Sequence, residues 1–199
     1  MTPLMFAARY GGSCSARTVE VLLALPAGRA SCGATDFFGA SVLHHAASNL
    51  DCDLSIITTL LREEHLGAAA VNLPQWPRSL TSRALMALCR GLVRTIGATD
   101  SLKRHFAAMA GATPLHNAAL RGDSQLCQLL LDARADPTLE NALGLTPLQA
   151  AAWQGHNGRL QGRVPEALAA ALPASVADER PESLLQCPFC VASRARSYS

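Results

Sequence analysis

Residues 113–122 read TPLHNAALRG, and the same phrase returns at residues 146–155 as TPLQAAAWQG. The two copies start thirty-three residues apart and keep Thr, Pro, Leu and a pair of Ala in the same order. A fixed period of this length is typical of stacked-repeat proteins, in which each unit packs on its neighbours. The sequence therefore predicts a repeat architecture, and a binding surface spread over several units is the first function to look for.

Earlier parts of the chain carry further copies of this phrase. Residues 2–11 read TPLMFAARYG and residues 41–50 read SVLHHAASNL, while an eroded copy, SRALMALCRG, starts at residue 82. The starts at 2, 41, 82, 113 and 146 are unevenly spaced, which indicates connections of different lengths. We expect four or five units, in which the stretch from 82 is either a degenerate repeat or a plain insertion.

Each copy has the composition of a short helix followed by a second one. Thr or Ser can cap the first helix, Pro suits its first position, and Gly tolerates the conformation that ends it. Paired Ala favours the helix and lets a neighbouring helix approach closely. A second apolar stretch with helical spacing follows at residues 19–23, 56–61 and 126–131. The predicted unit is helix, turn, helix and a polar link, which makes the fold all-α.

This pattern resembles the ankyrin repeat. The resemblance is carried by Gly144 to Leu148, Ala151–Ala152, Gly122, Leu129–Leu130 and Ala135–Asp136. It covers residues 2–61 and 105–156 well and residues 80–104 poorly, and it implies an ankyrin-like helix-turn-helix solenoid. Arg134 stands where the family usually has a left-handed Gly, a departure expected to cost about 1 kcal/mol.

We expect the repeat domain to cover residues 1–172, with a long inserted loop at 62–80, and a flexible polar tail to follow at 173–199. Pro74 and Pro77 exclude a continuous helix around Trp76. Trp76 is therefore either an exposed anchor for a partner or a cover for the gap left by the eroded unit. The array begins at a helix without a preceding cap, so either it continues upstream or another element covers that face.

Composition narrows the class of partner and the compartment. The net charge of +2 over 199 residues predicts no strong attraction to nucleic acid or membrane, and no apolar run is long enough to cross a bilayer. Seven scattered cysteines favour reduced thiols in an intracellular compartment, which we expect to be the cytoplasm, with the nucleus as an alternative. The first 19 residues are also compatible with a transit peptide, although residues 2–11 already belong to a repeat helix.

Only one motif has the character of a metal or redox site. Cys187 and Cys190 supply half of a tetrahedral zinc site, so zinc would need ligands from a second chain. A redox role would need a βαβ context that this sequence lacks, and an incidental pair is the third interpretation. His44 and His45 are interpreted as structural, because His44 occupies the position of His116 in its repeat. We expect no bound metal, no cofactor and no catalytic residues.

The resemblance implies a non-enzymatic module that binds another protein through the concave face formed by hairpins and inner helices. The alternatives are a zinc-dependent adaptor of the ubiquitin-ligase type that uses the tail cysteines, and a fragment of a larger ankyrin-containing enzyme. By matching position in the repeat, the predicted partner-binding residues are Arg9, Tyr10, Phe37, Phe38, Ser48, Asn49, Arg90, Leu120, Arg121, Leu143, Trp153 and Gln154.

Overall fold

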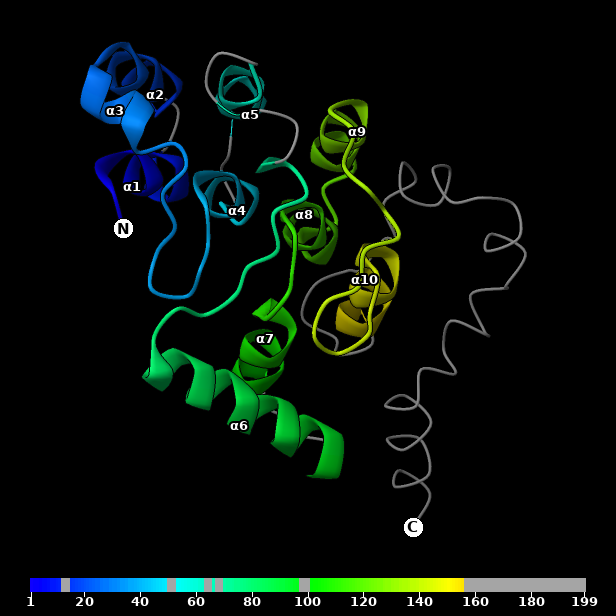
Figure 1. Cartoon of the computed structure of the whole chain (residues 1–199). Coiled ribbons are helices and arrows are strands. Elements are labelled where there is room, and N and C mark those ends of the chain that lie inside the picture. The colour runs from blue at the N-terminus through cyan, green and yellow to red at the C-terminus, as the bar shows by residue number, and fades with distance from the viewer. Residues whose placement is uncertain (12–14, 50–52, 63–65, 67–69, 97–100, 156–199) are drawn as a thin grey trace.

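The computed structural model describes residues 1–11, 15–49, 53–62, 66, 70–96 and 101–155 (Figure 1). Within these residues the chain forms ten α-helices and no strand, as the sequence predicts. The helices are α1 (Pro3–Tyr10), α2 (Ser15–Ala24), α3 (Pro26–Ala30), α4 (Val42–Ala47), α5 (Leu54–Leu60), α6 (Leu80–Ile96), α7 (Ser101–Met109), α8 (Pro114–Arg121), α9 (Ser124–Asp132) and α10 (Pro147–Gly155).

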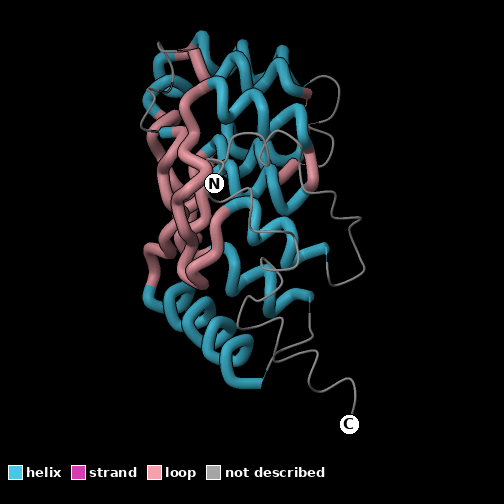
Figure 2. Tube along the Cα trace, turned by 90° about the vertical axis from the view of Figure 1, so that its right-hand side faces the viewer, coloured by secondary structure: helices cyan, strands magenta, loops and turns pink. Residues whose placement is uncertain are grey.

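Seven of these helices build a two-layered stack. Helices α1, α4, α8 and α10 form one layer and α2, α5 and α9 the other (Figure 1). Within the first layer α1 packs on α4, α4 on α8 and α8 on α10, and the pairs α1–α2, α4–α5 and α8–α9 join the layers. The connecting loops gather along one edge of the stack (Figure 2). The predicted helix-turn-helix solenoid is therefore confirmed.

Local sequence explains where the stacked helices begin and end. Thr2 accepts a hydrogen bond from the backbone of Met5, and Thr113 and His116 form a reciprocal capping box at the start of α8. Asp53 and Asp123 cap α5 and α9 with their carboxylates. Gly122 ends α8 in the left-handed conformation that glycine adopts without steric cost.

Two buried histidines define which unit follows which. Nε2 of His116 lies 3.0 Å from the carbonyl oxygen of Leu145, the residue before Thr146. Nε2 of His44 lies 3.0 Å from the carbonyl oxygen of Ala112, the residue before Thr113, although Ala112 is 68 residues further along the chain. The unit that starts at 113 therefore stacks directly on the unit that starts at 41, and α6 and α7 lie outside the row.

The hairpins between units show where α6 and α7 enter the chain. Each hairpin closes with a backbone hydrogen bond, from Asp36 to Ala40 in one and from Asn141 to Leu145 in another. In the hairpin between them Gln75 N donates to Ala112 O at 2.8 Å. Positive φ angles of 81°, 72° and 75° recur before the closing position, at Gly39, Gly111 and Gly144. The two-residue tip of the middle hairpin is thus replaced by residues 76–110, which contain the eroded copy of the phrase.

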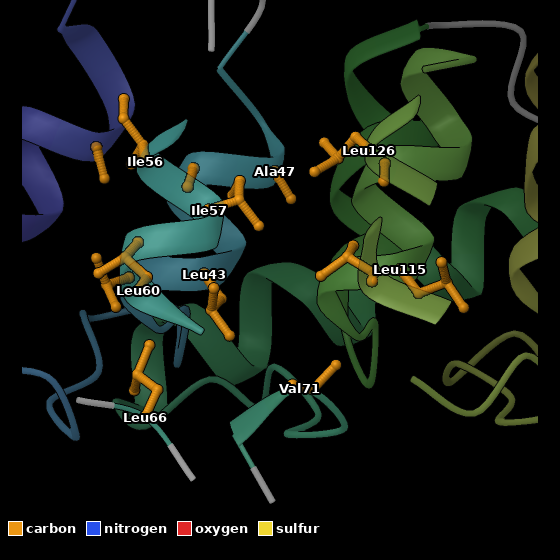
Figure 3. Packing of buried hydrophobic residues seen from close by; sticks show 14 of the residues in the cluster. Leu43, Ala47, Ile56, Ile57, Leu60, Leu66, Val71, Leu115 and Leu126 are labelled. Carbon is orange, nitrogen blue, oxygen red and sulfur yellow. The ribbon is translucent and has the colours of Figure 1, made fainter. Parts of the chain in front are cut away.

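Apolar side chains form two clusters. The larger cluster runs along the stack and includes Leu43, Ile57, Leu115 and Leu126 (Figure 3). The smaller one joins the inserted helices to the stack and consists of Cys89, Val93, Ala107, Ala108, Leu143, Leu145 and Ala150, with Phe106 and Leu120 against it. The insertion is therefore held to the array by apolar packing as well as by its two chain connections.

Candidate protein-binding face

The inserted helices α6 and α7 cover part of the inner layer of the stack, which is the layer formed by α1, α4, α8 and α10. Helix α7 lies beside this layer and α6 lies beyond α7 (Figure 1). Phe106 of α7 packs against the smaller cluster, and its ring centroid lies 5.9 Å from that of Phe38 in the first hairpin. Apolar surface on the hairpins and on α8 and α10 is thereby occupied by the chain itself.

The predicted hairpin residues therefore differ in their accessibility. Leu143 is buried in the smaller cluster, and Phe38 is half-buried against Phe106. Phe37 is 52% exposed, and its carbonyl oxygen accepts from Ser82 Oγ at 3.2 Å. Phe37 is thus the hairpin residue among these that is open to a partner.

On the helix side, two predicted residues connect neighbouring units. Asn49 Nδ2 donates to Ala8 O at 3.1 Å, and Arg121 Nη1 donates to Ala47 O at 3.3 Å. Both positions reach back to the end of the preceding inner helix, where the last carbonyl groups lack helical partners. These contacts give both side chains a structural role. Ser48 makes a local bond from its hydroxyl to His44 O.

Helix α1 carries an exposed aromatic pair. Its Tyr10 occupies the repeat position that Asn49 and Arg121 have in their units. Tyr10 is 63% exposed and Phe6 is 59% exposed, with ring centroids 5.0 Å apart. The guanidinium of Arg9 lies 5.9 Å from the centroid of the Tyr10 ring, within range of a cation–π interaction. Phe6 was missed by matching repeat positions, although its spacing of four residues from Tyr10 places both on one helix face.

Arg9 also lies near the inserted helices. Desolvation lowers the pKa of His105 in α7, and the positive charge of Arg9 lowers it further. The charge of Arg9 at the end of α1 therefore reaches α7.

The remaining predicted residues are spread over other parts of the chain. Arg90 lies half-buried on α6, outside the row of inner helices, and Leu120 packs against the smaller cluster. Trp153 and Gln154 belong to α10, but their side chains lie outside the described part, as do Cys187 and Cys190.

Trp76 lies at the start of the insertion and is 52% exposed. Its backbone crosses Gly39 so closely that a Cβ there would overlap the Trp76 carbonyl oxygen. Its ring approaches Gly111, within 3.2 Å of the place a Cβ would take. The indole therefore packs partly on the middle hairpin and leaves about half of its surface free.

The buried histidines and cysteine of the stack have shifted pKa values that fit structural roles. Burial lowers the pKa of His44 and of His116 to about 4, so both rings are neutral near pH 7 and fit the bonds described above. Burial likewise raises the pKa of the Cys127 thiol to about 12. In the described residues, no three His, Cys, Asp or Glu side chains gather as metal ligands, and no helix there is long and apolar enough to span a membrane.

Comparison with known proteins agrees with the stack. Residues 84–160 match the family model for ankyrin repeats, with three copies. This part of the chain carries ankyrin repeats. The matched range includes most of α6 and all of α7, which the histidine contacts place outside the row. The units that start at residues 2 and 41 precede it. No curated protein matches the chain.

Ankyrin repeats indicate a module for protein–protein interaction, and domains of this kind are generally non-enzymatic. The arrangement fits this kind of function, because the stack presents a continuous surface drawn from several units.

Proposed function

We propose that the chain is a non-enzymatic module that binds another protein through the concave face formed by its hairpins and inner helices. The observation that carries this proposal is the exposed pair Phe6 and Tyr10 beside Arg9. Aromatic side chains and arginine are the residue types that dominate binding energy at protein interfaces. Binding here rests on shape and side-chain complementarity, without a chemical step.

Because of the insertion, the accessible part of this face lies mainly on the N-terminal units. Helix α7 occupies apolar surface on α8, α10 and the hairpins, whereas Tyr10 and Phe37 remain more than half exposed. A partner that approaches the concave face therefore meets the end of α1 and the tip of the first hairpin. Buried free thiols at Cys32, Cys89 and Cys127 support a reducing compartment such as the cytoplasm as the place of this interaction.

Affinity capture with three versions of the chain tests the proposal. The test variant combines Phe6→Ala and Tyr10→Ala, and the matched control combines Val21→Ala and Leu25→Ala, which also removes exposed apolar side chains. We expect quantitative mass spectrometry to find at least one protein that wild type and control retain and the test variant loses. Its purified form should then bind the test variant about tenfold or more weakly. Equal recovery of every partner by all three would rule out this face.

A further inference from the structure

Helix α6 has one side in the smaller cluster and another side without a partner in the described part of the chain. Cys89 and Val93 are buried with Ala107 of α7. Leu85 and Leu88 are 41% and 61% exposed. Figure 1 shows α6 as the outermost helix on this side of the stack.

Basic side chains line the opposite edge of the same helix. Arg83 and Arg90 are seven residues apart, close to two full helical turns, which puts them on one edge. Leu85 and Leu88 are three residues apart and lie on the other edge. In the described residues, neither arginine forms an ion pair, so both charges remain available to an outside partner.

The insertion differs in charge from the rest of the chain. Residues 76–110 contain six of the 17 basic residues and one of the 15 acidic residues, which gives them a net charge of +5 and leaves −3 for the remainder. Helix α6 alone has three arginines and no acidic residue. The net charge of the whole chain is therefore near zero although the insertion is strongly positive. The positive field around the exposed leucines of α6 attracts negatively charged partners.

We propose that the exposed side of α6 binds an acidic amphipathic helix of a partner protein. The apolar residues of that helix pack on Leu85 and Leu88, and its carboxylates pair with Arg83 and Arg90. Paired apolar and charged edges determine both orientation and specificity, as they do between other amphipathic helices. This surface is separate from the aromatic pair of α1 and goes beyond the proposed concave face.

The residues favour a protein helix over other occupants. A second copy would bring one net charge of +5 against another, which costs free energy. Membrane-surface helices commonly carry Trp or Phe on the apolar side, and α6 contains no aromatic residue. Single-stranded nucleic acid would need aromatic platforms for its bases, which α6 equally lacks, and phosphates would leave the leucines without an apolar partner.

A displayed library of helical peptides, selected on the full chain, tests this inference. The counter-target is the full chain with Arg83→Glu, Arg90→Glu and Leu88→Ser, three changes at positions that are exposed or half-buried. We expect enriched peptides to combine apolar residues at helical spacing with net negative charge, and the counter-target to bind them at least tenfold more weakly, about the effect of losing an interface charge pair. Circular dichroism checks that the counter-target is folded.

Two further arms distinguish this surface from the concave face and from a lipid or DNA site. The Phe6→Ala, Tyr10→Ala variant must bind the enriched peptides like wild type. The proposal for the concave face and the proposal for α6 can therefore each fail without the other. Vesicles of phosphatidylserine and a DNA duplex are tested with wild type and the counter-target. The inference is overturned if enriched peptides are neutral or basic, if none is enriched, or if vesicles or DNA depend more strongly on the α6 residues.

Discussion

At the scale of single residues, His44 and His116 each connect their own repeat unit to the next one by hydrogen bonds. In both, Nδ1 accepts from the backbone at the start of its own helix, and Nε2 reaches a carbonyl oxygen of the next unit at 3.0 Å. A neutral ring with the proton on Nε2 satisfies both bonds, whereas a proton on Nδ1 would remove the acceptor. The stacking contact therefore depends on the protonation state of the imidazole.

This dependence predicts loss of stability in mild acid. The pKa of each ring is about 4 in the folded chain, against about 6.5 when unfolded. In this window the unfolded chain binds more protons, so the free energy of unfolding is full above about pH 6.5 and falls toward about pH 4. We expect a loss of roughly 2 kcal/mol per histidine between pH 7 and pH 5. Urea denaturation at both pH values measures it.

The matched variant is His44→Gln with His116→Gln, because Gln149 already takes this position in the last described unit and accepts from Thr146 N at 2.9 Å. The double variant should be less stable at neutral pH, since the inter-unit contacts are lost, but its stability should change much less on acidification. An acid loss as large as that of the wild type would show that other groups cause it.

Arg134 gives a second prediction at this scale. Its φ of 67° makes it the only non-glycine residue with positive φ in the described part of the chain, which confirms the conformation expected from the sequence. We expect Arg134→Gly to raise the free energy of unfolding by about 1 kcal/mol, because glycine adopts this backbone without steric cost. Arg134→Ala should leave it nearly unchanged in the same urea titration. A stabilisation by Ala as large as by Gly would assign the effect to the side chain.

At the scale of elements, the insertion is the feature that departs most from a regular array. Its entry and exit meet at one hairpin, where Gln75 N bonds to Ala112 O and Gly111 N bonds to Gln75 O. The hairpin closes as its neighbours do, so the inserted residues add no separation between the stacked units. An addition at a hairpin tip is compatible with stacking because it leaves the contacts between successive inner helices intact.

Removal of the insertion tests this view. In the shortened chain, residues 76–110 are replaced by two polar residues, the tip length at 37–38 and 142–143. We expect α4 and α8 to stay packed, and the free energy of unfolding to fall by roughly 1–3 kcal/mol, because the smaller cluster becomes exposed. Hydrogen exchange of the α4 and α8 amides and urea denaturation measure the two effects. Loss of protection in α8, or separate unfolding of the two halves, would contradict it.

At the scale of the whole molecule, the repeat phrase predicted the fold well because its physics is local. Capping by Thr113, the helix-forming Ala pairs and the turn at Gly122 act within one unit, so they can be recognised without knowledge of contacts across the chain. The predicted contact residues differ in accessibility, since Asn49 and Leu143 are buried by neighbours that position in the repeat does not reveal. Whether the predicted set binds a partner stays a prediction.

The sequence by itself determined the repeat unit and the all-α fold, because capping, helix propensity and turns act over a few residues. The left-handed conformation at Arg134 followed from the resemblance to the ankyrin repeat, since local sterics disfavour it for arginine. Tertiary structure alone decided that α4 stacks on α8, that α7 covers part of the inner layer, and that Leu85 and Leu88 stay exposed on α6. These outcomes depend on which apolar faces meet across 68 residues of chain between His44 and Ala112. Burial of this kind is non-directional, so hydrophobicity in the sequence marks the faces that need cover and leaves their partners open.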